Sequence, residues 1–137
     1  MTTRANADAE GWSRIAEIVD WDVAGVPPRV MGIGPVPAIQ GLLKRTGLRL
    51  EDIDLVEINE AFSAQYLGCE KLLGLKRDRA NVNGGAIALG HPLGATGTRL
   101  IVTLARELKA RGAKYGIASA CIGGGQGIAV LLKNPAA

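Results

Sequence analysis

The sequence has few residues of several types, and each shortage excludes a class of protein. It contains one histidine and two cysteines among 137 residues. Cys69 and Cys121 are far apart in the chain, and with a single histidine they cannot supply a plausible zinc site. Two cysteines also do not make a disulfide framework. We therefore expect no metal and a reducing compartment.

Long apolar runs and strong charge are missing as well. No run of eighteen apolar residues occurs, so we expect no membrane span. Aromatic residues make up 4% of the chain and the net charge is only +3. Because basic residues do not alternate with aromatic ones, we expect no nucleic-acid partner. The densest basic cluster is either a solvated helix end, which the helix dipole favours, or a phosphate-binding patch; it comprises Lys71, Lys76, Arg77 and Arg79.

What the chain does have is enough apolar sequence for one folded domain. At 137 residues and 47% apolar, it can bury roughly two-thirds of its unfolded surface. Residues 1–12 become acidic too early for a transit peptide and lack the apolar core of a signal peptide. We expect residues 1–12 to be a disordered tail and residues 13–137 to form the domain.

Glycine is plentiful, and five glycines fall within residues 81–97. Glycine at this density is tolerated mainly where the backbone passes close to another group or takes a positive φ. The only histidine, His91, lies in this stretch between Gly90 and Pro92. The stretch is therefore a candidate functional loop.

Hydrophobic periodicity predicts the order β-α-β-α-β-α-β-β. Strands are expected at residues 15–23, 54–58, 81–83, 115–120 and 127–132, and helices at residues 35–46, 60–73 and 96–112. In the first strand Val19, Trp21 and Val23 share one side, and Asp20 and Asp22 the other. This order predicts a three-layer α/β/α fold, whose mostly parallel five-stranded sheet ends in an antiparallel hairpin.

A second glycine motif does not indicate a nucleotide site. Gly32 and Gly34 form a Gly-x-Gly pattern, but Pro35 and Pro37 follow directly. Proline has no backbone N–H, and a dinucleotide loop needs those donors for phosphate. Pro35 is better interpreted as a first-turn residue of the following helix.

Three chemically active side chains fall at predicted strand ends or in the glycine-rich loop. They are Asn59, His91 and Cys121, and sites in such sheets collect beyond the carboxyl ends of strands. Each also has a structural interpretation. Asn59 would cap the next helix, His91 would be a loop histidine satisfied by the backbone, and Cys121 would be a buried structural cysteine.

Three motifs containing these residues resemble the C-terminal signature blocks of the thiolases. They are Asn59-Glu60-Ala61-Phe62, Gly90-His91-Pro92-x-Gly94-x-x-Gly97 and Cys121-x-Gly123-Gly124-Gly125-x-Gly127. Residues 30–38 and 81–94 are most similar to 3-ketoacyl-CoA thiolases of fatty-acid β-oxidation. The resemblance covers nearly the whole chain and implies the second half of the thiolase fold.

The resemblance implies a role for each matched residue. Asn59 would hold a water that forms an oxyanion hole together with Nε2 of His91, and His91 would also help to ionise the nucleophilic cysteine. Cys121 would be the general acid–base thiol. The N–H of Gly123 would donate to a second oxyanion hole, and Met31 and Phe62 would line the acyl pocket.

The resemblance also implies the ligands and the compartment. Coenzyme A thioesters would enter as substrates, with no bound cofactor, in the cytoplasm or the mitochondrial matrix. The partner would be an N-terminal thiolase half or further copies of the chain.

The nucleophilic cysteine of a thiolase belongs to the N-terminal half, and no matching block is present here. Cys69 lies inside a predicted helix, where a buried thiol is normally inert. We therefore expect the chain to be inactive alone and to act when complemented. The alternative is a non-catalytic interaction or CoA-binding module.

Overall fold

Four strands form one mixed sheet in the computed structural model, which describes residues 1–137. Their order across the sheet is β1-β4-β3-β2. The strands are β1 (Glu17–Gly25), β2 (Leu55–Ile58), β3 (Tyr115–Ile122) and β4 (Gln126–Lys133).

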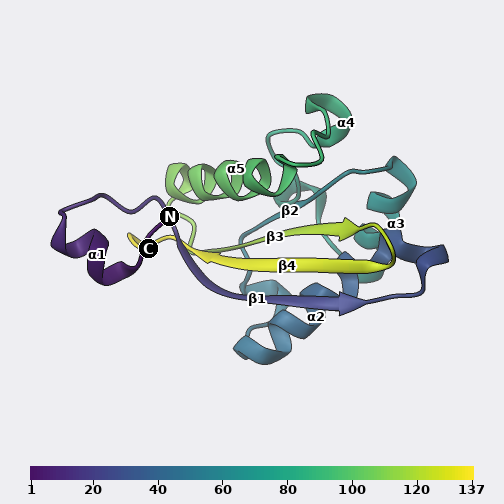
Figure 1. Cartoon of the computed structure of the whole chain (residues 1–137), viewed down its shortest axis with the longest axis horizontal. Helices are drawn as coiled ribbons and strands as arrows, with labels where there is room; N and C mark the ends of the chain where they lie inside the picture. Colours follow the sequence, from purple (N-terminus) through teal and green to yellow (C-terminus); the bar gives the residue numbers. More distant parts are fainter.

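Three strands run in one direction and β4 runs in the other (Figure 1). The predicted antiparallel hairpin is confirmed as β3 and β4. However, β4 lies between β1 and β3, so two of the three strand pairings are antiparallel and only β2 with β3 is parallel. The prediction of a mostly parallel sheet therefore holds for strand direction but not for pairing.

The predicted fifth strand at residues 81–83 does not form. Only one isolated parallel bridge joins Val56 to Ala80. Asn81 then takes a φ of 47°, a left-handed conformation that ends extended backbone. The Asn81 side chain, rather than a further strand residue, meets the backbone of Ile58.

The three predicted helices are confirmed as α2 (Pro35–Thr46), α3 (Ser63–Leu73) and α5 (Thr96–Arg111). The structure adds a short helix that was not predicted, α4 (Ala86–Leu89), and the 3-10 turns η1 (Pro28–Ile33), η2 (Leu50–Asp52) and η3 (Arg77–Arg79). Gly47, Gly74 and Gly112 end α2, α3 and α5 with positive φ, as C-terminal glycines do. Helix α3 begins three residues later than residues 60–73 predict, and its N-cap is Phe62, so the capping role for Asn59 is wrong.

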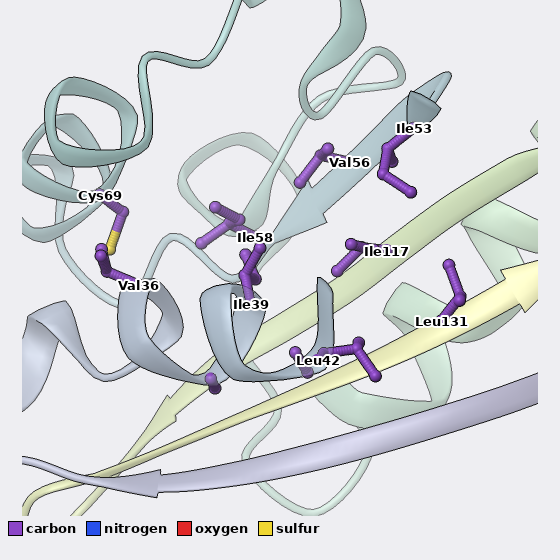
Figure 2. Packing of buried hydrophobic residues seen from close by; sticks show 11 residues of the cluster. Val36, Ile39, Leu42, Ile53, Val56, Ile58, Cys69, Ile117 and Leu131 are labelled. Carbon is purple, nitrogen blue, oxygen red and sulfur yellow. The ribbon is translucent and has the colours of Figure 1, made fainter. Parts of the chain in front are cut away.

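Helices cover both faces of the sheet, which confirms the three-layer α/β/α architecture (Figure 1). One core lies between α2, α3 and the strands, and Figure 2 shows its residues, which include Ile39, Ile58, Cys69 and Ile117. A second core lies between α5 and the opposite face and includes Leu100, Leu104, Leu108 and Leu132.

Strand β1 has the alternation that the sequence predicts, but its apolar side is open. Val19, Trp21 and Val23 are 48%, 59% and 51% exposed. The polar side faces α2, where Asp20 forms a salt bridge with Arg45. Alternation shows which residues share a face and not which face another element covers.

Residues 1–12, which we expected to be a disordered tail, contain a short helix, α1 (Arg4–Ala9). Thr3 caps it by accepting a hydrogen bond from the N–H of Asn6. Arg4 forms a salt bridge with Glu17 of β1, and Ala7 is buried.

None of the helices has the length and apolar character required to cross a membrane.

The Gly32-x-Gly34 motif serves packing. A Cβ at Gly34 would collide with the backbone of Gln126 and Gly127, and one at Gly32 would lie 2.7 Å from the side chain of Gln65. These glycines therefore let η1 and α2 approach α3 and the β3–β4 hairpin closely.

Candidate active site

Asn59 lies immediately after β2 and is almost completely buried, with 1% of its surface exposed. Its backbone N–H donates to the carbonyl of Ser119, which extends the parallel pairing with β3 by one residue. Its side-chain Nδ2 lies 3.3 Å from Nε2 of His91. Its Oδ1 is buried and has no partner in the protein, so the amide retains capacity to accept a hydrogen bond.

Asn81 anchors the chain that leads to the histidine loop. Its Oδ1 accepts from the N–H of Ile58 at 2.9 Å, and its Nδ2 donates to the carbonyl of Ile58 at 2.9 Å. Nδ2 also donates to Glu60 Oε1 at 3.0 Å. The other carboxylate oxygen of Glu60 accepts from the N–H of Ile87 in α4 at 3.0 Å. Asn81 and Glu60 thus tie the end of β2 to α4.

His91 follows α4 through Gly90, whose φ is 95°. The ring bridges two elements, because Nε2 faces Asn59 and Nδ1 lies 2.7 Å from Oγ1 of Thr96, the first residue of α5. Thr96 is buried. The histidine is therefore oriented by side chains at both nitrogens, which excludes the interpretation of a histidine satisfied by the backbone alone.

Cys121 lies near the carboxyl end of β3, opposite Gly127 of β4. It is half-buried and free. Burial raises the pKa of its thiol, while a hydrogen bond from its own backbone opposes this shift. A thiol with a raised pKa is mostly protonated at neutral pH, and its thiolate is a stronger base.

The structure brings Asn59 and His91 into contact, whereas Cys121 makes no side-chain hydrogen bond to either. Because β2 and β3 are parallel neighbours with Ile58 beside Ser119, Asn59 and Cys121 lie at the same edge of the sheet. Alternation places Cys121 on the face covered by α2 and Asn59 on the face covered by α5. A molecule bound at the carboxyl ends of β2 and β3 could therefore contact both Asn59 and Cys121.

Gly123 lies in the turn between β3 and β4 and is exposed. Its N–H donates to no acceptor in the protein. The next two glycines, Gly124 and Gly125, have φ values of 86° and 98°. Glycine permits this turn conformation, which leaves an N–H donor open beside Cys121.

Met31 and Phe62, the predicted acyl-pocket residues, lie on neighbouring segments. Met31 is in η1 and Phe62 immediately precedes α3. Phe62 is 61% exposed and Met31 is half-buried. Their segments touch where Gly32 packs against Gln65.

A buried ion pair connects β2, the strand that Asn59 follows, to α5. Glu57 is 2% exposed, and Arg99 Nη1 lies 3.4 Å from its Oε2. Burial raises the pKa of Glu57 to about 7, although the charge of Arg99 opposes this. Nε and Nη2 of Arg99 are buried without partners. The pair joins β2 to the first turns of α5.

Cys69 does not extend the site. It is fully buried in α3, and its thiol donates to the carbonyl of Gly32 at 3.4 Å. Burial raises the pKa of Cys69. The position and contacts agree with an inert core thiol. No group of three or more His, Cys, Asp or Glu residues could hold a metal ion.

Two of the four residues of the basic cluster have partners within the protein. Arg77 forms a salt bridge with Glu70, and Arg79 donates to the carbonyl of Ile53 at 3.0 Å. These contacts favour the solvated helix end over the phosphate patch.

The fold is that of the thiolases. It is similar to the structure of human mitochondrial 3-ketoacyl-CoA thiolase in complex with CoA, with a TM-score of 0.95 and 54% sequence identity, covering 97% of this chain and 34% of that one. The family model described as "Thiolase, C-terminal domain" matches residues 12–134. The chain therefore belongs to the thiolase family, as the three motifs predicted.

Curated relatives agree with this assignment. The chain is 61% identical over 122 residues to bovine (Bos taurus) mitochondrial 3-ketoacyl-CoA thiolase, covering 89% of this chain and 31% of that protein. It is 54% identical over 126 residues to acetyl-CoA acetyltransferase of Escherichia coli K12, covering 92% of this chain and 32% of that protein. The chain thus spans about a third of the length of these relatives.

Sequence reasoning missed the residues that orient the site. The sequence predicted Thr96 only as the first residue of a helix at residues 96–112, whereas in the structure its hydroxyl also contacts His91. The roles of Glu60, Asn81 and the pair Glu57–Arg99 were not predicted. Their side chains act across long sequence separations, which no local pattern reports.

Proposed function

We propose that this domain supplies the oxyanion-hole and acid–base groups of an acyl-CoA thiolase. The reaction is thiolytic cleavage of a 3-ketoacyl-CoA or the reverse Claisen condensation of acyl-CoA. The observation that carries the proposal is the contact of Asn59 with His91, at the same sheet edge as the free thiol of Cys121. In the relatives whose names state this activity, the matched region is about a third of the protein.

Asn59 and His91 would stabilise the thioester oxygen as it becomes enolate-like. The unpartnered Oδ1 of Asn59 can bind a water, and Nδ2 of the same amide lies 3.3 Å from Nε2 of His91. Donors fixed before the reaction stabilise developing charge without reorganisation. Losing one such donor typically costs about 2.7–4 kcal/mol of transition-state stabilisation.

Cys121 would move the proton. In condensation its thiolate takes a proton from the α-carbon of one acyl-CoA, and in thiolysis it takes the proton of the CoA thiol. The raised pKa suits this role, because a stronger base removes a carbon-bound proton more readily. The open N–H of Gly123 would donate to the oxygen of the thioester on the nucleophilic cysteine.

That nucleophilic cysteine must come from outside this chain, because Cys69 is buried in α3 and bonded to Gly32. We therefore propose that the domain is inactive alone and acts with an N-terminal thiolase half, or within an assembly that supplies one. Met31 and Phe62 would line the acyl pocket. By analogy with the named relatives, the compartment would be the mitochondrial matrix or the cytoplasm.

Complementation tests the proposal. The purified chain is mixed with an N-terminal thiolase half, and CoA-dependent loss of a 3-ketoacyl-CoA is followed. We expect activity only in the mixture and its loss with Cys121→Ala. A stable complex without thiolysis would contradict the proposal.

A second candidate is a non-catalytic interaction module. The observation in its favour is the open apolar side of β1, formed by Val19, Trp21 and Val23. Exposed apolar patches commonly mark interaction surfaces. Light scattering that shows a monomer, without binding of an apolar dye, would contradict this candidate.

A further inference from the structure

The charged pair of Glu57 and Arg99 lies directly behind the contact between Asn59 and His91. Strand residues two apart share a face, and Leu55 of β2 packs into the core beneath α5. Glu57 and Asn59 therefore point to the face of β2 that α5 covers. On this face Glu57 lies one step before Asn59, and it is 2% exposed.

Thr96 and Arg99 are three residues apart in the first turn of α5, so their side chains lie on the same side of the helix. Oγ1 of Thr96 lies 2.7 Å from Nδ1 of His91, and Nη1 of Arg99 donates to Oε2 of Glu57 at 3.4 Å. The first turn of α5 is thus joined to β2 at two successive levels. One level runs through His91 to Asn59, and the other runs directly from Arg99 to Glu57.

Apolar packing anchors α5 farther along the helix. Leu104 lies so close to β3 that a Cβ at Gly116 would be 2.8 Å from its Cδ1. Leu104 comes about two turns after Thr96. The bond from Arg99 to Glu57 is the only side-chain hydrogen bond between α5 and β2. The start of the helix, which contacts His91, therefore depends on this pair for its position over β2.

The pair is a poor source of stability. Arg99 makes a single long hydrogen bond to Glu57, and its Nε and Nη2 are buried without partners in the protein. Taking two charges out of water is costly, and their attraction offsets that cost only when the remaining donors are also satisfied. Replacing such a pair with apolar residues of similar volume is often neutral or stabilising.

We propose that Arg99 is a positioning residue that, through Glu57, sets the distance between α5 and β2 and so keeps Asn59 and His91 in contact. This inference rests on the proposed function and deepens it, because the two side chains can act on one thioester oxygen only while they are held together. Arg99 acts through the helix and not on the substrate. A displacement of about 1 Å caused by a remote change can lower a rate about 10²-fold.

The contact can be followed by NMR in the isolated chain, because His91 is the only histidine. The side-chain amide hydrogens of Asn59 should give a nuclear Overhauser effect to the ring hydrogens beside Nε2 of His91. We expect this signal in the wild type and its loss in Glu57→Leu/Arg99→Met, which replaces the pair with apolar side chains. The urea midpoint of this double variant should be no lower than that of the wild type. A wild-type chain without the signal would overturn the inference.

Arg111→Met is the matched control, because Arg111 pairs with Glu107 at the exposed far end of the same helix. It should leave the signal unchanged. A stable double variant that keeps the signal would overturn the inference. If the double variant does not fold, Arg99→Lys takes its place, since lysine is too short to span a gap that arginine reaches at 3.4 Å. An unchanged signal in Arg99→Lys would also overturn the inference.

The complemented enzyme separates this inference from the proposed function. We expect the double variant to lower kcat by about 10–100-fold with little change in KM. Glu57→Gln, which keeps an acceptor oxygen for Arg99, should retain most of the activity. Loss of the signal in the double variant, together with a wild-type chain that fails to complement thiolysis, would support the inference and contradict the proposed function. Full kcat in a double variant that has lost the signal would contradict the positioning role of Arg99.

Discussion

Nδ2 of Asn59 and Nε2 of His91 lie 3.3 Å apart, although 32 positions separate the two residues in the sequence. Asn59 is fixed by the ladder between β2 and β3, and His91 by the turn between α4 and α5. Their contact places a directed donor or acceptor at the carboxyl edge of the sheet, where sites in α/β folds collect.

This contact predicts the kinetic effect of truncating either partner. In the complemented enzyme, we expect Asn59→Ala and His91→Ala each to lower kcat by about 10²–10³-fold, the usual effect of losing one oxyanion-hole donor. Steady-state thiolysis measures this. Asn83→Ala is the control, because Asn83 is exposed and bonds only Glu107. Activity within a factor of about two of wild type in both variants would rule out the oxyanion role.

The thiol of Cys121 should show its raised pKa in alkylation. Burial raises this pKa above the ordinary thiol value of 9.0, so the thiolate fraction should still be rising at pH 9. Mass spectrometry of iodoacetamide-treated protein should show a Cys121 rate that increases through this range. Cys69, which is fully buried, should remain unmodified in the folded protein. A Cys121 rate that levels off below pH 9 would contradict the prediction.

Glu57 makes stability depend on pH. Its folded pKa is about 7 and its ordinary value is 4.5, so the native state holds more protons between these values. The free energy of unfolding should therefore fall as the pH rises from about 4.5 to about 7, by up to about 3 kcal/mol. Urea unfolding of the wild type and Glu57→Gln should show this slope only in the wild type.

The control for Glu57 is Glu10→Gln, because Glu10 is exposed and makes no side-chain hydrogen bond or salt bridge. Its pH profile should follow that of the wild type. An equal slope in Glu57→Gln would assign the pH dependence to another group.

Asn81 should be important for both stability and loop order. Its side chain satisfies the N–H and the carbonyl of Ile58, so Asn81→Ala leaves both groups without a partner. We expect a loss of about 2–4 kcal/mol in the free energy of unfolding, from two unmade hydrogen bonds and a left-handed φ that alanine adopts poorly. Urea unfolding measures this loss.

Hydrogen exchange provides the second readout for Asn81. Because Asn81 and Glu60 tie β2 to α4, exchange at residues 86–90 should accelerate in Asn81→Ala. Asn83→Ala should leave it unchanged. Unaltered protection in Asn81→Ala would show that the loop is held by other contacts.

The sequence predicted the parts of the fold that depend on local patterns. Helix α2 begins at Pro35 and ends before Gly47 as expected, because proline and glycine mark helix ends by their own backbone limits. The strand at residues 81–83 failed, because the Asn81 side chain replaces backbone pairing at Ile58. The exposure of the apolar side of β1 could not be predicted, because it depends on which face of the strand α2 covers in the folded protein.

In the candidate site, too, some residues could be predicted from local patterns and others could not. Asn59, His91 and Cys121 could be found from their motifs, because glycine turns and strand ends leave a local signal. Thr96 and the pair Glu57–Arg99 could not, because their roles arise from contacts between β2, the histidine loop and α5.

A double-mutant cycle between His91 and Cys121 tests most directly whether these residues serve one site. Single-turnover thiolysis is measured in the complemented enzyme for wild type, His91→Ala, Cys121→Ala and the double variant. Residues that act on the same reacting atoms lose activity non-additively, so the double variant should be no slower than Cys121→Ala alone. Rate losses that multiply would mean that the two residues act independently, and would contradict the shared site.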